Sequence, residues 1–200
     1  MNKGVKNIGI SGIIGVGKST LTQKIADKLG FKAFMEPVDT NEYLDLFYTD
    51  MKKYGFPMQI YLLNKRFRLH QQSVWGDKGT VQDRTIYEDT IFAKMLHESK
   101  DISDIDYNTY SELFDNMSYF LHRPDVIVYL DTSPETALER IKNRNRECET
   151  DMSLEYLTAL RDGYEQWLVS IRNIIPVVRI DWNTFGSVDD VIEKIDGLFM

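Results

Sequence analysis

Short runs of apolar residues alternate along this 200-residue chain with longer stretches in which apolar residues recur every three or four positions. The short runs are typical of buried strands, and the longer stretches are typical of amphipathic helices. We expect strands at 8–11, 32–35, 80–82, 126–130 and 177–180. Because strands alternate with helices, the pattern predicts an α/β fold in which helices cover both faces of a five-stranded parallel sheet.

The expected helices carry start and stop signals of their own. We place them from near Gly17 to Leu29 and at 41–47, 57–73, 87–98, 107–122, 134–144 and 153–171. The first is followed by Gly30, a residue type that commonly closes helices. Ser133 is the expected N-cap of the helix that begins at Pro134. The last of these helices has an aromatic stripe on helical spacing, which we interpret as core.

The segment after the first expected strand fits a phosphate-binding loop. Four residues match the pattern G-x-x-x-x-G-K-[ST], namely Gly12, Gly17, Lys18 and Ser19. Glycines allow backbone N–H groups to surround phosphate oxygens, and the N-terminal end of the following helix attracts the same anion. We therefore expect Lys18 to bridge the terminal phosphates of a nucleotide and the Ser19 hydroxyl to help hold Mg²⁺. A chance match in a glycine turn would lack the helix that follows.

Polar residues follow the next three expected strands, at the edge where open parallel sheets bind ligands. Glu36, in Glu36-Pro37-Val38, could accept the proton of an attacking hydroxyl. Asp83 is a candidate Mg²⁺ ligand, and Arg84 could hold Glu36 or neutralise charge on the acceptor. Asp131 follows the fourth strand. A Glu-Pro turn or an Asp-Arg helix cap would explain these pairs structurally, but their position at strand ends favours a role in the chemistry.

The densest basic stretch of the chain runs from Arg140 to Arg146. Arg140 and Arg144 are four residues apart and would share a helical face. Over the phosphate loop, such a group could clamp and neutralise a transferring phosphoryl group. A solvated helix end is the common alternative for a charge run. We favour the clamp because an acidic protein that binds phosphate needs its cations at that site.

Composition sets limits on the protein class. With 42% hydrophobic residues in 200, we expect one domain with a well-buried core. No apolar run approaches the length of a membrane span, and we expect a cytoplasmic protein with no signal peptide. The single cysteine, Cys148, excludes an internal disulfide. A net charge of −7 argues against nucleic acid as the main partner.

Several motifs in this order and spacing resemble the deoxyribonucleoside kinase family, especially its bacterial deoxyadenosine/deoxycytidine kinases. Besides the phosphate loop, which includes Gly15 and Thr20, the matching segments are Glu36-Pro37-Val38, 43–48, 59–66, 82–93, 140–147 and 154–157. The resemblance covers nearly the whole chain. It implies the three-layer fold of phosphate-loop nucleoside triphosphatases with an arginine-rich lid at about 140–152. It also implies transfer of the γ-phosphate of ATP, with Mg²⁺, to the 5′-hydroxyl of a deoxynucleoside.

Residue by residue, the resemblance implies a role for each matching side chain. Glu36 would be the general base, supported by Arg84, with Lys18 and the lid arginines Arg140, Arg144 and Arg146 on the phosphates. The expected acceptor contacts are Tyr48 and Glu149 for the 3′-hydroxyl, Gln59 and Phe92 for the base, and Arg66 with Asp89 at the charged end of the base pocket. Asp181 would lie near the adenine of the donor. The chain has Asp83-Arg84-Thr85 where mammalian members read Glu-Arg-Ser.

In having both Arg66 and Asp89, the chain resembles family members that accept purines and cytosine. The expected order is deoxyadenosine first, deoxycytidine or deoxyguanosine next, and thymidine disfavoured. The family also implies a homodimer and inhibition by an end-product deoxynucleoside triphosphate. Two alternatives are a nucleoside monophosphate kinase of the thymidylate kinase type and a non-catalytic nucleotide-binding protein. Glu36 argues against the monophosphate kinase, because a monophosphate acceptor needs cations near it and does not need a carboxylate base.

Overall fold

The computed structural model describes residues 5–36, 41–146, 149 and 152–199. In this part of the chain, five parallel strands form one sheet in the spatial order β2-β3-β1-β4-β5. The strands are β1 (Asn7–Ser11), β2 (Lys32–Phe34), β3 (Thr80–Asp83), β4 (Val126–Asp131) and β5 (Val177–Asp181). All five expected strands are therefore confirmed, each with one end shifted by one residue.

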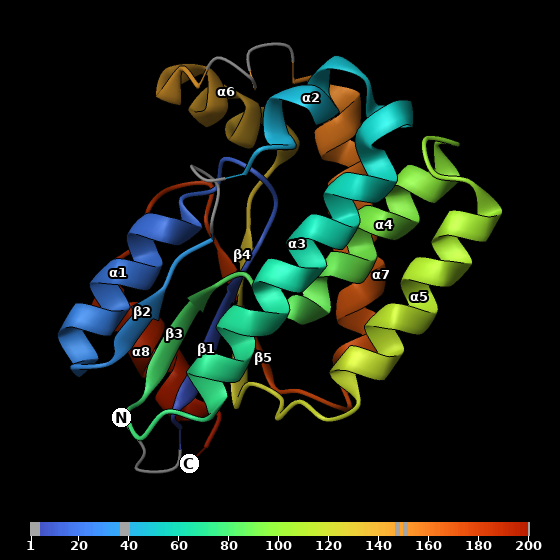
Figure 1. Cartoon of the computed structure of the whole chain (residues 1–200). Coiled ribbons are helices and arrows are strands. Elements are labelled where there is room, and N and C mark those ends of the chain that lie inside the picture. The colour runs from blue at the N-terminus through green and yellow to red at the C-terminus, as the bar shows by residue number, and fades with distance from the viewer. Residues whose placement is uncertain (1–4, 37–40, 147–148, 150–151, 200) are drawn as a thin grey trace.

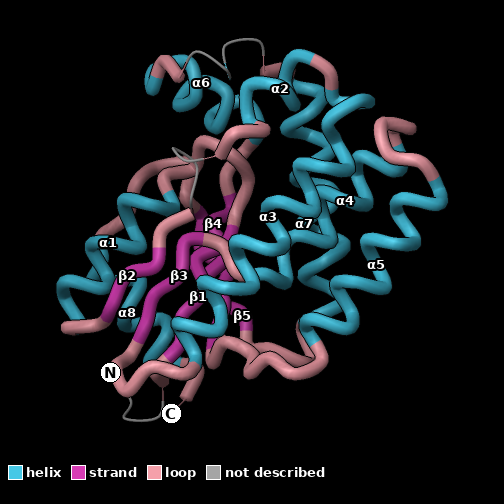
Figure 2. Tube along the Cα trace, viewed as in Figure 1, coloured by secondary structure: helices cyan, strands magenta, loops and turns pink. Residues whose placement is uncertain are grey.

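Helices cover both faces of the sheet, as predicted (Figures 1 and 2). They are α1 (Lys18–Leu29), α2 (Leu44–Thr49), α3 (Met51–Val74), the 3₁₀ turn η1 (Ile86–Glu88), α4 (Asp89–Glu98), α5 (Asp104–Ser118), α6 (Pro134–Arg144), α7 (Leu154–Ile171) and α8 (Val188–Gly197). Helices α1 and α8 lie on one side, and α3, α4, α5 and α7 lie on the other (Figure 1). Helices α2 and α6 lie beyond the carboxyl ends of the strands, where they border the site.

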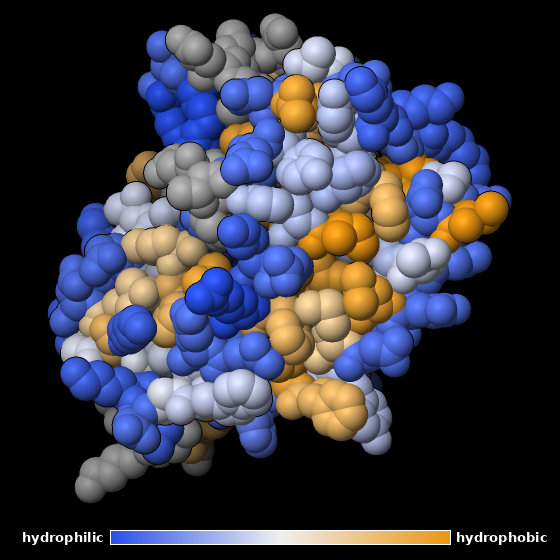
Figure 3. Space-filling view, in the orientation of Figure 1, coloured by the Kyte–Doolittle hydropathy of each residue, from blue (hydrophilic) through white to orange (hydrophobic). Residues whose placement is uncertain are grey.

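The core is centred on the middle strands of the sheet. Ile8, Ile10, Val126, Ile127 and Val128 have no exposed surface. Consecutive residues of β4 point to opposite faces of the sheet. Because all three of its first residues are buried, both faces of that strand are covered, as expected for a parallel sheet between helical layers. Figure 3 shows hydrophobic side chains on the surface over α3 and α5, with hydrophilic residues around them. None of the helices in the described part of the chain combines the length and apolar character needed to cross a membrane.

Serine side chains define the start of four helices. Their hydroxyl oxygens accept a backbone N–H of the first turn, and the N-caps are Ser103, Ser133, Ser153 and Ser187. The predicted cap at Ser133 is confirmed. Ser187 begins α8, which we did not predict although acidic residues in its first turn are a further start signal.

The predicted start of the long helix at Pro57 is wrong. Helix α3 begins at Met51, with Asp50 as its N-cap accepting the N–H of Lys53 at 2.9 Å, and it continues through Pro57. Proline is favoured in the first turn because that turn has unpaired N–H groups, but its presence does not require a helix to begin there. The helix predicted at 107–122 is shifted in the structure. The Ser103 cap starts α5 at Asp104, and the helix ends at Ser118.

We predict that Gly15→Ala destabilises the protein because Gly15 lies directly against α6. Its φ is +86°, and an added Cβ would come within 2.7 Å of the Ala137 carbonyl oxygen and 2.6 Å of Ile141 Cγ1. The combined strain and overlap should lower the free energy of unfolding by about 1–3 kcal/mol in urea titrations. Gly30→Ala is the control, because φ is +65° there but no atom lies within 4 Å. An equal or larger loss in the control would contradict the role of close packing.

Candidate active site

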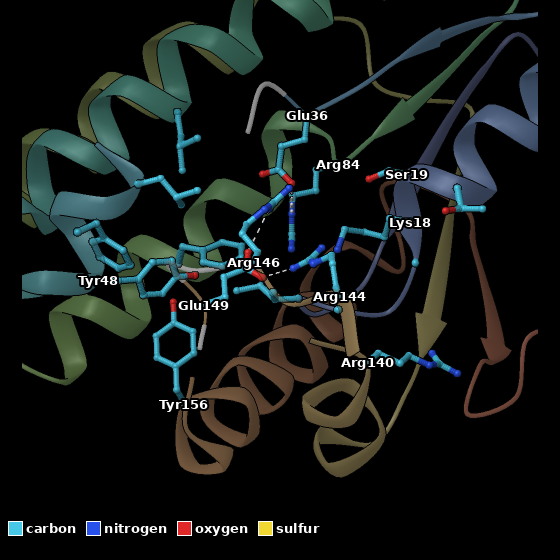
Figure 4. A pocket seen from close by; sticks show the side chains of 18 of the residues that line it. Lys18, Ser19, Glu36, Tyr48, Arg84, Arg140, Arg144, Arg146, Glu149 and Tyr156 are labelled. Atoms are coloured by element: carbon cyan, nitrogen blue, oxygen red, sulfur yellow. Dashed lines mark hydrogen bonds and ion pairs between the residues drawn. The ribbon is translucent and has the colours of Figure 1, made fainter. Parts of the chain in front are cut away.

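A cavity of about 670 Å³ opens at the carboxyl ends of the strands. Its walls come from the loop after β1, the end of β2, helices α2, α3 and α4, and the segment from α6 to α7. Most residues predicted for the site line it, namely Gly15, Gly17, Lys18, Ser19, Thr20, Glu36, Tyr48, Gln59, Arg66, Arg84, Phe92, Arg140, Arg144, Arg146 and Glu149. Figure 4 shows side chains from both ends of the cavity pointing into the same space.

The phosphate loop is held by its own backbone geometry. Gly12, Gly15 and Gly17 all have φ values in the left-handed or positive region, which side-chain-bearing residues rarely adopt. Lys18 begins α1 and donates from Nζ to the Ile13 carbonyl oxygen at 2.8 Å. Burial, together with the nearby Arg84 cation, lowers the pKa of Lys18 to about 8. A bound phosphate would stabilise the charged form, so the loop is suited to an anion.

Ser19 and Asp83 form a pair suited to Mg²⁺. They come from adjacent segments because β1 and β3 are neighbours, and the Ser19 hydroxyl donates to Asp83 Oδ2. The other oxygen, Oδ1, is buried without a hydrogen-bond partner among the described residues, and burial raises the pKa of Asp83. No cluster of three His, Cys, Asp or Glu ligands occurs in the described ranges. One carboxylate and one hydroxyl fit a Mg²⁺ ion that takes its other ligands from phosphates and water.

Glu36 lies between two arginines. Arg66, on α3, pairs with Oε1, and Arg84, just after β3, donates from Nε to Oε2 at 3.2 Å. The arginine side chains are 4% and 3% exposed, and that of Glu36 is 18% exposed. Burial opposes the negative charge, but Arg66 and Arg84 outweigh it and lower the pKa of Glu36 to about 2. Glu36 is therefore a carboxylate throughout the neutral range.

The far end of the cavity combines an aromatic side chain with polar groups. Gln59 is 2% exposed, and its Oε1 has no partner among the described residues. Arg66 also pairs with the fully buried Asp89, which lies behind it and outside the lining of the cavity. The Arg84 guanidinium lies 4.9 Å from the centre of the Phe92 ring. An amide with an unpaired oxygen and an aromatic ring in the same cavity are suited to a planar heterocycle with hydrogen-bonding edges.

The basic segment divides into two parts. Arg144 pairs with Glu149, and Arg146 lies 3.2 Å from the same carboxylate. The Arg140 side chain points away from them in Figure 4. It donates to the carbonyl oxygens of Trp182 and Asn183 at 2.9 and 2.8 Å, and its guanidinium lies 4.0 Å from the Phe185 ring centre. Arg140 and Arg144 therefore both line the cavity from α6, as their spacing predicts, but backbone carbonyls after β5 engage Arg140 whereas Arg144 pairs with Glu149.

Some predicted residues lie outside the lining of the cavity. Gly12 shapes the phosphate loop from behind, and the exposed Asp181 accepts the backbone and side-chain N–H groups of Asn183. Asp131 pairs with Arg161 and Arg179 instead of facing the cavity. Pro37, Val38, Glu147 and Cys148, named in the sequence motifs, lie outside the described residues.

Sequence analysis missed several residues at the site. Leu44, Phe47, Tyr156 and Phe185 line the cavity. Tyr156 lies two residues after the start of α7, and its hydroxyl faces the Glu149 region in Figure 4. The aromatic stripe of α7 was interpreted as core, which is confirmed for the buried Tyr164 and Trp167. Tyr156 and Tyr164 are eight residues apart and therefore lie on the same helical face. This spacing could have indicated that the aromatic stripe reaches the cavity.

Comparison with known proteins agrees with this geometry. A family model described as deoxynucleoside kinase matches residues 8–197. A deoxyadenosine kinase of Dictyostelium discoideum is 53% identical over 94% of this chain and 77% of its own length. A deoxyadenosine/deoxycytidine kinase of Bacillus subtilis is 41% identical over 94% and 90% of the two chains. The solved structure of M. mycoides deoxyadenosine kinase with bound dATP has a TM-score of 0.86 and 33% identity over 96% of this chain and 99% of that one. The chain therefore belongs to the deoxynucleoside kinase family.

Proposed function

We propose that the protein transfers the γ-phosphate of ATP to the 5′-hydroxyl of a deoxynucleoside. Deoxyadenosine is the preferred acceptor, deoxycytidine and deoxyguanosine follow, and thymidine is disfavoured. The observation that carries this proposal is the position of Glu36 in the same cavity as Lys18. A carboxylate suited to a neutral alcohol thus shares a cavity with a lysine suited to a triphosphate. Relatives described as deoxyadenosine, deoxyadenosine/deoxycytidine and deoxyguanosine kinases support the choice of acceptors.

In the proposed reaction, the 5′-oxygen attacks the γ-phosphorus, its proton passes to Glu36, and ADP leaves. A carboxylate with a pKa of about 2 is a weak base. Proton transfer therefore occurs late, after most of the bond to the leaving oxygen has broken, as in a loose transition state. The main contribution of Glu36 is to align the hydroxyl. A monophosphate acceptor would bring negative charge toward the same carboxylate, which argues against a nucleoside monophosphate kinase.

Cations near the phosphate loop would neutralise the transferring group. Lys18 would contact the terminal phosphates. When the donor binds, Arg144 and Arg146 would leave Glu149 and pair with phosphate oxygens instead. Ser19 and Asp83 would hold Mg²⁺, which supplies positive charge to the phosphate oxygens when it is bound. In this proposal the backbone of Gly12, Gly15, Gly17 and Thr20 surrounds the phosphates, and Arg140 and Asp181 belong to the donor's adenine end.

The acceptor would lie with its sugar near Glu36 and its base near Gln59. A carboxamide can pair with an adjacent donor and acceptor on the base edge, while Phe92 stacks on the ring. Arg66, held from behind by the buried Asp89, would form the charged end of the base pocket, and in this proposal that end disfavours the thymine methyl group. Tyr48 and Glu149 would bind the 3′-hydroxyl.

The remaining parts of the proposal concern assembly and cellular role. We assign the protein to cytoplasmic nucleotide salvage, as a homodimer packed through its long helices. The M. mycoides relative has been solved with dCTP and with dATP. We infer that a deoxynucleoside triphosphate end product inhibits this chain, with its phosphates in the loop and its base in the acceptor pocket.

Glu36→Gln should abolish most of the activity while leaving nucleoside binding largely intact. Loss of a general base typically lowers kcat by about 10²–10⁴-fold, and the amide keeps the shape of the side chain. Steady-state kinetics with deoxyadenosine and ATP would measure this. Glu42→Gln, at an exposed glutamate nearby, is the matched control. Full kcat in Glu36→Gln would assign the base to another residue.

The acid side of the pH profile should depend on Arg66. In the wild type, kcat/KM for deoxyadenosine should stay flat from pH 7 to pH 5, because a carboxyl with a pKa of about 2 stays ionised and Lys18, with a pKa of about 8, stays protonated there. Arg66→Gln removes one of the two arginines and should raise the pKa of Glu36, so that activity declines as pH falls through the range below about 5. Arg68→Gln, exposed on the same helix, should keep the flat profile. Identical profiles in all three proteins would contradict the role of Arg66.

A comparison of acceptors tests the substrate class. With ATP and Mg²⁺, deoxyadenosine should have the highest kcat/KM of the four deoxynucleosides and thymidine the lowest. Deoxyadenosine monophosphate should be a much poorer acceptor than deoxyadenosine because of the Glu36 carboxylate. A higher kcat/KM for thymidine than for the other three would overturn the base preference, and preference for the monophosphate would overturn the reaction class.

A further inference from the structure

Two buried side chains to which the sequence analysis gave no role at the site lie behind Arg84. Glu88, in η1, and Tyr164, in α7, are both 0% exposed. Tyr164 donates its hydroxyl to Glu88 Oε2 at 2.7 Å. Arg84 Nη1 donates to the Tyr164 oxygen and lies 3.5 Å from the same carboxylate oxygen. Arg84 therefore has a fixed set of partners on the side opposite Glu36.

The backbone fixes the other end of the Arg84 side chain. Its φ is +65°, a left-handed conformation that is costly for a residue with a Cβ, and its N–H donates to the Ile10 carbonyl oxygen at 3.1 Å. The sharp turn after β3 thus directs the Arg84 side chain toward the cavity, and the partners of the guanidinium determine its final position.

Glu88 is itself held at both carboxylate oxygens. While Oε2 accepts from Tyr164, Oε1 accepts the Thr85 N–H at 2.9 Å in a capping box. Tyr164 stacks near Tyr129, with ring centres 5.7 Å apart, and contacts Trp167 edge-on. Burial raises the pKa of Tyr164 well above its usual value, so the hydroxyl remains a neutral donor. This arrangement has little freedom to rearrange.

We propose that Glu88 and Tyr164 are positioning residues for catalysis: they fix the Arg84 guanidinium so that Nε meets Glu36 Oε2 and holds that carboxylate toward the acceptor hydroxyl. The inference rests on the proposed role of Glu36. Glu88 also supplies Arg84 with a permanent buried counterion, so the cation does not depend on Glu36 alone for its charge partner. Neither residue lines the cavity, so neither would contact substrate.

The test compares Tyr164→Phe and Glu88→Gln with the wild type, and uses Tyr129→Phe as the matched control. Tyr129 is a buried tyrosine whose ring stacks near that of Tyr164, but within the described part of the chain its hydroxyl makes no hydrogen bond to Arg84 or Glu88. We expect kcat to fall about tenfold in Tyr164→Phe and further in Glu88→Gln, as for the loss of one or more hydrogen bonds to a charged group. KM for deoxyadenosine and for ATP should stay within about twofold, and Tyr129→Phe should keep full kcat.

A double-mutant cycle separates positioning from a purely structural role. In the Glu36→Gln background, Tyr164→Phe should cause no further loss of kcat, because it acts through Arg84 on Glu36. A loss of the same factor in both backgrounds, or unchanged kcat in both single variants, would overturn the proposal. If Glu88→Gln fails to fold, Tyr164→Phe decides, since it removes only one oxygen atom.

The two proposals fail in different ways. If the Glu36→Gln variant kept full activity, Glu36 would not be the catalytic base and the proposed mechanism would be overturned. An inactive Glu36→Gln combined with fully active Tyr164→Phe and Glu88→Gln would leave the base in place and overturn only the positioning role. A rise in both KM values with unchanged kcat would assign Glu88 and Tyr164 to the shape of the cavity and would also overturn it.

Discussion

The site depends on one electrostatic constraint, the mutual neutralisation of charges that the fold buries at the carboxyl edge of the sheet. Lys18, Arg66 and Arg84 are each at most 7% exposed, and an unpaired cation at such a depth is costly. Glu36 and Asp89 provide the compensating charge directly. Glu36, the proposed catalytic carboxylate, is thus a structural counterion whose position two arginines fix in the free protein.

The topology of the sheet makes this constraint possible. Because β1 lies between β3 and β4, the loop after β1 and the polar residues after β3 meet at one edge. Ser19 and Asp83 contact each other although 64 positions separate them in the sequence. Helix α3 crosses the same edge and brings Gln59 and Arg66, which are seven residues apart and therefore lie on one face. A sheet with a different strand order would separate these groups.

The sequence predicted the strands well because each is an apolar run that the two helical layers must bury. It predicted the phosphate loop and Glu36 because local patterns encode them. Three features were not predictable in this way. Pro57 lies inside α3 because the Asp50 cap starts the helix earlier. Arg140 turns to backbone carbonyls that a sequence pattern does not display. Tyr164 belongs to a stripe that indicates core, and only the tertiary structure reveals its hydroxyl beside Arg84.

Arg66 links the two carboxylates on either side of it. One guanidinium pairs with the buried Asp89 and with Glu36, so in the proposed complex recognition of the base and chemistry at the sugar would share one cation. A nucleobase that draws Arg66 toward Asp89 weakens the pairing on Glu36 and leaves Arg84 as the main partner of that carboxylate. Because coupling of this kind follows from a shared cation, a change in base preference at this position also changes the electrostatics of the transfer step. Gln59 makes no ion pair with Glu36 in the described part of the chain, so in the proposed complex selectivity that is independent of catalysis would be more readily adjusted there than at Arg66.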